Sequence, residues 1–417
     1  MITDAEFAAA MAALGPFEPA PRIAAGVSGG ADSMALAILA LTWTRERSGS
    51  LLALVVDHCL RSESGREAAQ TAARLDARGI EAKILEIQGL EHGPSLAERA
   101  RMARYAALEA ACAEAGILHL LLGHHAGDQA ETLQMRALGG SGPAGMAGMA
   151  PVVETRTLRL LRPLLAIPPA RLRATLRPFG VAWIEDPSNN DASALRPRLR
   201  LLRRDNAGAG SATAALVAAS VASGRQRSEQ ERRIACNLAE GIAMRPEGFA
   251  LLSGQPLQPP VLAALLQTIA GAPFPPAIRS VSALASAPRP ATLAGVRLLS
   301  AGRLGTELLA VREDAAMAPP VSAQPGAVWD GRFRLNAEVR LPAEATLGPL
   351  GDDAARLRRF SPLPSAVLRT LPAVRIGPAL LAVPHLLYPD RKGCERFPVL
   401  FSPPRPAAAA PFWIGDA

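Results

Sequence analysis

Short apolar runs alternate with longer amphipathic stretches along the first 140 residues of the chain. The short runs predict β-strands at residues 22–27, 51–57, 81–87 and 117–123. The longer stretches predict helices at residues 32–47, 64–78, 95–115 and 128–138. This alternation predicts βαβ units and an α/β fold with a doubly wound parallel sheet. Ligands of such sheets bind beyond the carboxyl ends of the strands, so the residues that follow each strand are candidate site residues.

The pattern changes after this region and predicts three parts. Residues 139–148 form a glycine-rich loop, which is either a linker or a lid. We expect a first domain at residues 1–210, a helical linker at residues 211–250 and a smaller mixed α/β domain at residues 251–417. Within the last part, residues 259–270 predict a helix, and the alternation at residues 328–341 predicts a hairpin.

The formal net charge of +8 is unevenly distributed. Residues 1–150 have a balance of −5, residues 151–210 of +6 and residues 211–417 of +7. An acidic first part followed by a basic remainder fits a small-molecule site joined to a polyanion-binding surface. Solubility alone explains the same charge equally well.

Cysteine usage and hydropathy exclude several classes of protein. The four cysteines lie far apart and form no C-x-x-C pair, which argues against a disulfide framework, a thiol-redox site or a zinc ribbon. The first residues lack the basic segment of a secretory signal, and the longest apolar stretches are too short to span a bilayer. We therefore expect a soluble, cytoplasmic protein with no membrane partner.

The turn after the first predicted strand reads Ser-Gly-Gly-Ala-Asp-Ser, from Ser28 to Ser33. Glycines allow the backbone to approach a phosphate, and the hydroxyl and N–H groups at the start of the next helix supply donors. Asp32 is unfavourable beside an anion unless it holds Mg²⁺ next to the phosphates. The absence of a G-K-[ST] sequence excludes a Walker A loop.

This hexapeptide resembles the loop of PP-loop ATP pyrophosphatases, and further motifs resemble the tRNA(Ile)-lysidine synthase family. The similarity covers about residues 22–204. The segments that carry it are the D-H-x-L-R sequence at Asp57–Arg61 with Glu67-Ala68, the A-R-x-x-R-Y sequence at Ala100–Tyr105, the H-H-x-x-D-Q-x-E-T sequence at His124–Thr132, the R-P-L-L sequence at Arg162–Leu165 and the D-x-S-N sequence at Asp186–Asn189.

Two positions depart from the family pattern. The family usually continues with R-N-x-I-R, where this chain has Pro197 in place of the asparagine. The acidic residue that is common before the D-Q pair is Gly127 here, so the acidic role is assigned to Asp128 alone.

The resemblance implies an enzyme that joins free L-lysine to C2 of the wobble cytidine of an isoleucine tRNA with a CAU anticodon. ATP adenylates the C2 oxygen and releases pyrophosphate, and the ε-amine of lysine then displaces AMP. The implied cofactors are ATP and Mg²⁺, and the family also allows a homodimer. The first predicted domain is then the ATP-binding catalytic domain, and the last one recognises tRNA.

The candidate site residues divide into three sets. The expected catalytic residues are Asp32, which also binds Mg²⁺, with Arg101, Arg104, His125, Asp128 and Glu131. The expected ATP-binding residues are Ser28, Gly29, Gly30, Ala31, Asp32, Ser33, Asp57 and His58. The expected tRNA-binding residues are Arg196, Arg198, Arg200, Arg203 and Arg204.

Physical arguments support these sets. His125, Asp128 and Glu131 recur at helical spacing and share one face of a helix start, where they suit a metal or the lysine ammonium. Arg101 and Arg104 also share a face and suit phosphates or the adenylate. Five arginines within nine residues suit RNA phosphates.

Two alternative functions remain open at the level of the sequence. The first is a tRNA thiolase of the same superfamily, against which the lack of paired cysteines argues. The second is a catalytically silent RNA-binding protein, against which the intact loop and histidine motifs argue.

Overall fold

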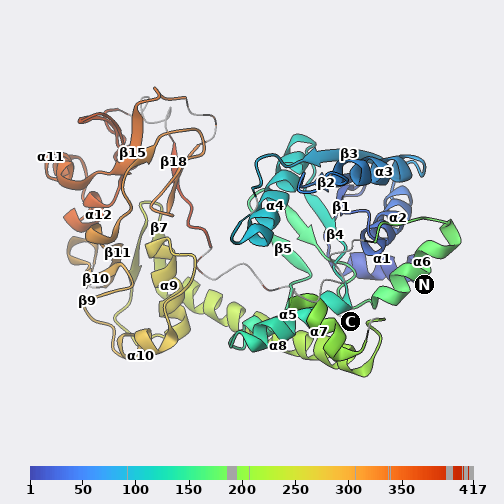
Figure 1. Cartoon of the computed structure of the whole chain (residues 1–417). Helices are drawn as coiled ribbons and strands as arrows, with labels where there is room; N and C mark the ends of the chain where they lie inside the picture. The colour runs from blue at the N-terminus through green and yellow to red at the C-terminus, as the bar shows by residue number, and fades with distance from the viewer. Residues whose placement is uncertain are drawn as a thin grey trace. The chain divides into compact units, whose positions relative to one another are not determined.

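The computed structural model describes residues 1–91, 93–185, 195–205, 207–305, 307–336, 338, 340–390, 398–405, 407 and 412. The chain divides into two compact units. The first comprises Met1–Glu229 together with Phe412, and the second comprises Gln230–Pro411 (Figure 1). None of the described helices is both long enough and apolar enough to cross a membrane.

The first unit is built on a six-stranded sheet. Its strands are β1 (Arg22–Val27), β2 (Ser50–Asp57), β3 (Glu81–Glu86), β4 (His119–Leu122), β5 (Val152–Glu154) and β6 (Arg159–Leu161). Their order across the sheet is β3-β2-β1-β4-β6-β5. All neighbouring pairs are parallel except β5 with β6, which is an antiparallel pair at one edge. The structure therefore confirms the α/β class and adds an antiparallel edge strand to the expected parallel sheet.

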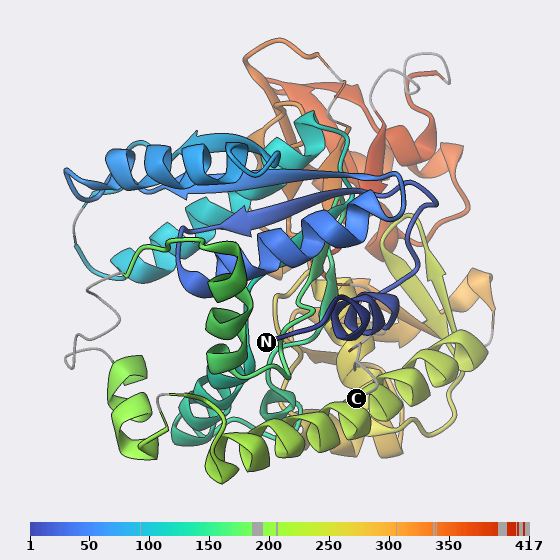
Figure 2. The ribbon, with the colours of Figure 1, turned by 90° about the vertical axis from the view of Figure 1, so that its right-hand side faces the viewer.

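Helices cover both faces of this sheet, and α2, α3 and α4 pack directly on its strands. The described helices of the first unit are α1 (Asp4–Ala12), α2 (Ala31–Arg45), α3 (Ser64–Asp76), α4 (Leu96–Glu114), α5 (Ala126–Leu138), α6 (Pro169–Leu176) and α7 (Leu195–Arg203), and α8 (Ser211–Gly241) runs from the first unit into the second. Because successive side chains of a strand point to opposite faces, Ile23 and Ala25 of β1 pack with α2 and α6, whereas Ala24 packs with Leu108 of α4. Figure 2 shows α2 lying along β1 and β2.

The strand order places a topological switch between β1 and β4. From β1 the chain proceeds to β2 and β3 on one side, and to β4 and β6 on the other. The loops after β1 and β4 therefore diverge from the carboxyl edge of the sheet at the point where doubly wound folds bind their ligands. These are the loops that carry Ser28–Ser33 and the His124-His125 pair.

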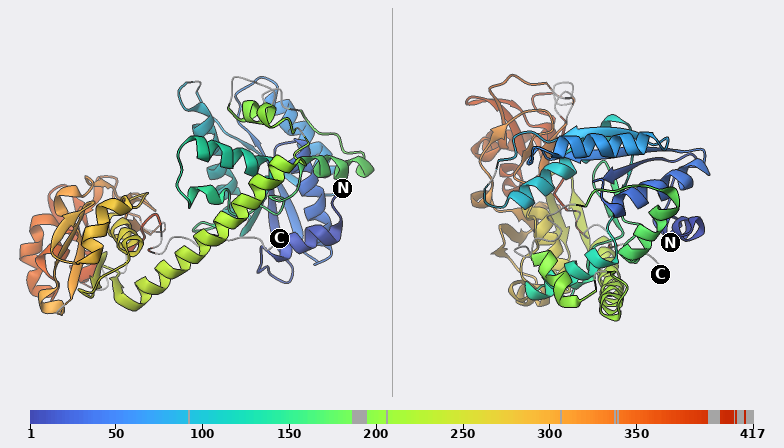
Figure 3. Two further views of the ribbon diagram at one scale, coloured as in Figure 1. Left: turned by 90° about the horizontal axis from the view of Figure 1, so that it is seen from below. Right: turned by 45° about the vertical axis from the view of Figure 1, so that its right-hand side comes forward.

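Helix α8 is a single long helix, as Figure 3 shows. It begins at Ser211, just after Gly208 and Gly210, and covers most of the predicted helical linker. The remainder of that predicted linker forms β7 (Ile242–Arg245) and the first residues of β8 (Phe249–Leu252), which pair with each other.

The described residues of the second unit form three antiparallel sheets. The first has the order β7-β8-β11-β10-β9, with β9 (Ala291–Leu293), β10 (Val296–Ser300) and β11 (Leu308–Arg312). The second has the order β12-β15-β16-β17, with β12 (Val321–Ser322), β15 (Ala345–Pro349), β16 (Pro372–Ile376) and β17 (Ala379–Ala382). The third comprises β13 (Val328–Trp329), β14 (Phe333–Leu335) and β18 (Val399–Phe401). The helices of this unit are α9 (Pro259–Ala270), α10 (Ile278–Ser286), α11 (Ala354–Leu357) and α12 (Ser365–Arg369).

Two expectations for this unit are confirmed. The predicted helix at residues 259–270 is α9, whose apolar residues form the core beside β8, β10 and β11. The predicted hairpin at residues 328–341 is the antiparallel pair β13–β14, which is shorter than expected. Its turn residue Asp330 is buried and accepts hydrogen bonds from Arg312 and Arg332, at 3.1 and 2.7 Å.

Candidate active site

The turn after β1 is shaped to expose backbone donors. Gly29 has a φ of +81°, and the N–H of Ile184 donates to its carbonyl at 2.8 Å. Gly30 is the N-cap of α2 and supplies no side-chain cap, so the first N–H groups of that helix lack the usual side-chain partner. An uncapped helix start after a glycine turn is a suitable site for a phosphate.

The two serines of this turn have different environments. Ser33 is buried, and its hydroxyl accepts from the Ser28 N–H at 3.1 Å and donates to the Gly30 carbonyl at 3.0 Å. These two hydrogen bonds of Ser33 stabilise the conformation of the turn. Ser28 is exposed, which leaves its hydroxyl the more accessible of the two for a ligand.

Helix α5 brings a histidine to the same turn. Gly123 follows β4 and lies against the start of α2: a Cβ there would lie 3.2 Å from the Ser33 Cα and 3.3 Å from the Asp32 carbonyl oxygen. This close approach places Nε2 of His125 3.4 Å from Oδ2 of Asp32. The two predicted motifs, which are separated by about 90 residues, therefore meet at the switch point.

His125 caps α5 with its own ring. Its Nδ1 accepts the backbone N–H groups of Gly127 and Asp128 at 3.1 and 3.3 Å, while Asp128 accepts the His125 N–H at 3.1 Å. Nδ1 is thereby held as an acceptor, so the ring proton lies on Nε2, toward Asp32. Burial lowers the pKa of His125, but Asp32 and Asp128 outweigh burial and the pKa is raised overall.

This cap also explains the Gly127 departure. A Cβ at Gly127 would lie 2.9 Å from Cε1 of the His125 ring. A larger residue would therefore displace the ring from its capping position. In this chain the acidic group at the helix start is Asp128, whose side chain is 16% exposed.

Asp32 fits a cation. Its Oδ1 is buried and has no hydrogen-bond partner, although its Oδ2 faces His125. Mg²⁺ characteristically takes one or two carboxylates together with phosphate oxygens and waters, so one open carboxylate oxygen beside a phosphate-binding turn suits it. Among the described residues, no cluster of three histidine, cysteine or acidic side chains forms a complete protein cage for a metal.

Glu131 lies in the interior, paired with arginines of α7. Its side chain is 1% exposed, and Oε1 accepts from Nε of Arg200 at 2.5 Å. Arg203 approaches the same oxygen at 3.5 Å and also donates to Gln134 at 2.8 Å. Nη2 of Arg200 extends to within 4.0 Å of Oδ1 of Asp128.

These contacts bear on the predicted arginine cluster. The side chain of Arg203 is only 4% exposed and is held by Glu131 and Gln134, so it offers little surface to an RNA in this structure. Arg200 points inward to Glu131, with its side chain 33% exposed. Arg196, Arg198 and Arg204 are exposed, while Pro197, the second departure from the family pattern, is buried.

Buried basic side chains gather near the ends of β4 and β6. Arg162, which follows β6, is 7% exposed; its Nη1 donates to the Ala150 carbonyl at 2.7 Å, and its Nε has no partner. Arg104 of α4 also has a buried, unpartnered Nε. Burial raises the pKa of Tyr105, but Arg101, Arg162 and Arg104 outweigh burial and lower it.

The same arginines surround His124. Burial lowers the pKa of His124 to about 3, and the positive charges of Arg162 and Arg104 act in the same direction. His124 is therefore neutral near pH 7, and its buried Nδ1 has no partner. Guanidinium N–H groups that are buried without acceptors suit an anionic ligand. Sequence reasoning missed Arg162 and His124 as site residues, although both belong to motifs that it had singled out.

The last two predicted ATP-binding residues, Asp57 and His58, lie at the end of β2. Asp57 is buried and accepts the Cys59 N–H at 2.8 Å, so it shapes the turn that follows its strand. His58 is half-buried with an unpartnered Nδ1, and its pKa is lowered by burial and by Arg104. The D-x-S-N sequence at residues 186–189 lies outside the described residues.

The glycine-rich loop at residues 139–148 is tied to α5. Arg136 donates to the carbonyls of Gly145 and Gly148 at 2.6 and 2.7 Å. Gln129 exchanges two hydrogen bonds with the backbone of Met149. These contacts secure the end of the loop nearer to β5, while Gly140 and Gly142 remain exposed.

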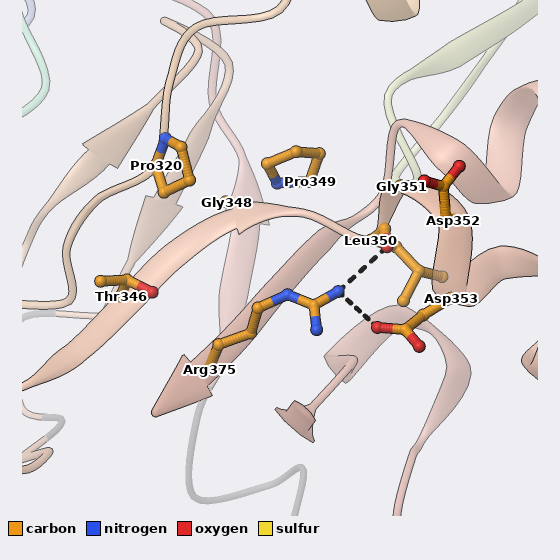
Figure 4. Close-up of a pocket in the computed structure, with 9 residues that line it drawn as sticks. All are labelled: Pro320, Thr346, Gly348, Pro349, Leu350, Gly351, Asp352, Asp353 and Arg375. Atoms are coloured by element: carbon orange, nitrogen blue, oxygen red, sulfur yellow. Dashed lines mark hydrogen bonds and ion pairs between the residues drawn. The ribbon is translucent and has the colours of Figure 1, made fainter. Parts of the chain in front are cut away.

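The second unit contains an open pocket of about 460 Å³ beside β15 and β16. Arg375 lines it and is paired with Asp353 at 2.7 Å and with the Leu350 carbonyl at 3.0 Å (Figure 4). None of the residues that line this pocket was predicted as a site residue.

The fold and the turn define a PP-loop protein of the α/β class: the family model described as "PP-loop domain" matches residues 3–204. Among curated relatives, the tRNA(Ile)-lysidine synthase of Ruegeria pomeroyi is 33% identical over 88% of this chain and 89% of its own length. That of Caulobacter vibrioides is 34% identical over 86% of this chain and 85% of its own length. The chain belongs to the tRNA(Ile)-lysidine synthase family.

Other similarities are more restricted. The tRNA(Ile)-lysidine synthase of a Bradyrhizobium species is 44% identical over 45% of this chain. The matched region spans 53% of that relative, so the chain matches only about half its length. Among solved structures, a U34-tRNA thiolase from Methanococcus maripaludis aligns with a TM-score of 0.45 and 16% identity, over 52% of this chain and 76% of that one.

We predict that Gly29→Ala destabilises the protein and Gly30→Ala does not. A Cβ at Gly29 would meet Oγ1 of Thr71 at 2.4 Å in a left-handed conformation, whereas at Gly30 its nearest neighbour is Oγ of Ser28 at 3.6 Å. Chemical denaturation should show a loss of about 1–3 kcal/mol for Gly29→Ala and less than about 0.5 kcal/mol for Gly30→Ala. Equal stability of the two variants would contradict the described turn.

We further predict that Glu131→Gln is more destabilising than Gln134→Ala. The first change leaves the guanidinium of Arg203 buried without its counter-charge, whereas the second removes one neutral acceptor from it. Denaturation should show losses of about 3–5 kcal/mol and about 1 kcal/mol, respectively. A Glu131→Gln protein as stable as the parent would show that this ion pair does not hold α7 to α5.

Proposed function

We propose that the protein ligates L-lysine to C2 of the wobble cytidine of a CAU-anticodon isoleucine tRNA, at the expense of ATP. The observation that carries the proposal is the meeting of the PP-loop turn with His125 and Asp128 at the switch point, in a chain of this family. Residues 1–210 are proposed as the catalytic domain, 211–250 as a helical linker and 251–417 as the tRNA-recognition domain.

The first step is the adenylation of the base. The C2 oxygen of cytosine attacks the α-phosphorus of ATP, and the bond to the β-phosphate breaks to release pyrophosphate. The N–H groups at the start of α2 and the hydroxyl of Ser28 hold the phosphates, while Arg101, Arg104 and Arg162 stabilise the charge on the departing pyrophosphate. Mg²⁺, when bound at Asp32, neutralises phosphate charge.

The second step replaces AMP by lysine. The ε-ammonium loses a proton to Asp128, the free amine attacks C2, the C2–O bond to the adenylate breaks, and AMP leaves. Asp128 is suited to bind the lysine ammonium because its carboxylate is partly exposed at the helix start. Glu131 acts indirectly, because it holds Arg200 beside Asp128. His125 carries its proton on Nε2, which faces Asp32. We therefore assign His125 the role of orienting Asp32, and not that of orienting the lysine amine.

One incubation distinguishes this function from the alternatives. Purified protein is mixed with Mg-ATP, radiolabelled lysine and a CAU-anticodon isoleucine tRNA transcript. We expect label in the RNA, together with AMP and pyrophosphate in equal amounts. A parallel reaction with a labelled sulfur donor should leave the RNA unlabelled. Sulfur incorporation would indicate a thiolase, and no incorporation of either label would indicate a silent binder.

A variant tests the role of Asp32. Asp32→Ala removes the open carboxylate oxygen beside the turn, and pyrophosphate release should fall by about 10²-fold or more. Filter binding should show unchanged affinity for tRNA. Asp4→Asn, which changes another acid in the first turn of a helix, serves as the matched control and should retain full turnover. Turnover by Asp32→Ala at the parental rate would overturn the assignment.

A further inference from the structure

Helix α7 has two faces of different character. Its inner face contacts α5 through Arg200 and Arg203, and Leu199 is buried beside them. Its outer face carries Leu195, Leu201 and Leu202, which are 42%, 60% and 78% exposed. Leu195 and Leu202 lie on the same side of the helix, because seven residues make nearly two full turns, and Leu201 is exposed about 100° further around the helix.

The surroundings of these leucines are basic. Arg198 lies between them on the outer face, and Arg196 and Arg204 are exposed near the two ends of the helix. No acidic residue occurs from position 195 to position 204. A partner for this face must therefore be anionic and must also offer apolar surfaces, and an RNA loop with unstacked bases meets both requirements.

The inner face of α7 places this helix beside the site. One turn of the helix separates Arg198 from Leu201 and Leu202, and Arg200 between them reaches Glu131 and Asp128. A base that enters the site must leave the stack of its loop, and the gap must be filled or the loop will close again. Proteins that unstack bases commonly insert apolar side chains at such steps.

We propose that Leu201 and Leu202 form an apolar wedge that fills the space left by the wobble base when it enters the site, with Arg198 on a flanking phosphate. This inference rests on the proposed function, since it takes the extruded base to be that of a tRNA anticodon loop. The two leucines are positioning residues, because they act on the neighbours of the reacting base.

The test uses a tRNA transcript with pyrrolocytidine, which fluoresces when unstacked, at the wobble position. The parent protein should raise the fluorescence on binding. Leu201→Ala/Leu202→Ala should reduce this rise at least about 10-fold at saturating protein, because the truncated side chains no longer fill the gap. On unmodified tRNA, kcat should fall by about the same factor, while KM for ATP should remain unchanged.

Two controls separate this effect from misfolding. Leu118→Ala truncates an exposed leucine at the amino end of β4, opposite the site, and should leave both the fluorescence and kcat at parental values. The double variant should unfold at the parental temperature, because both side chains are exposed.

Three outcomes would overturn the wedge. The first is a parental fluorescence rise in the double variant. The second is a parent that self-associates through this face, shown by light scattering, with dimers that the double variant loses and with unchanged fluorescence. The third is a fluorescence loss in the Leu118 control as large as in the double variant. Failure of the proposed function has a different signature: the parent would raise the fluorescence but transfer no lysine.

Discussion

The whole site depends on the close approach of two helix starts at the switch point of the sheet. Gly123 allows it, because a side chain there would press on the backbone of Asp32 and Ser33. The start of α2 presents unpaired N–H groups, and the start of α5 presents His125 and Asp128. In the proposed reaction, separation of the two starts by about one or two ångströms would misalign the phosphate and its acceptor.

The two neighbouring histidines of this junction lie in environments of opposite charge. His124 faces Arg162 and Arg104 and is neutral, whereas His125 faces Asp32 and Asp128 and has a raised pKa. The junction thus has a basic side and an acidic side only one residue apart. This arrangement of charge suits the proposed reaction, in which the anion pyrophosphate leaves and the cation lysine enters. The two histidines differ because their neighbours differ, since both are the same type of residue.

The sequence predicted the features that depend on local pattern. The first four strands of the first unit with the helices that follow them, α9 and the glycine turn could be inferred, because hydrophobic periodicity and turn chemistry act over a few residues. The pairing of Arg200 with Glu131 could not be inferred, because it joins residues 69 apart. The burial of the Arg203 side chain beside Glu131 could not be inferred either, for the same reason. Arg162 was missed because its burial depends on the position of β6 in the sheet, and that position could not be inferred from the sequence.

The most direct test of the account is a crystal structure of the protein with a non-hydrolysable ATP analogue. The account predicts that the triphosphate lies against the uncapped start of α2. It also predicts that the β- and γ-phosphates lie toward Arg104 and Arg162, and that the α-phosphorus faces Asp128. A triphosphate bound elsewhere in the first unit would contradict the account. So would a structure in which the backbone near Ile184 blocks the triphosphate from the turn after β1.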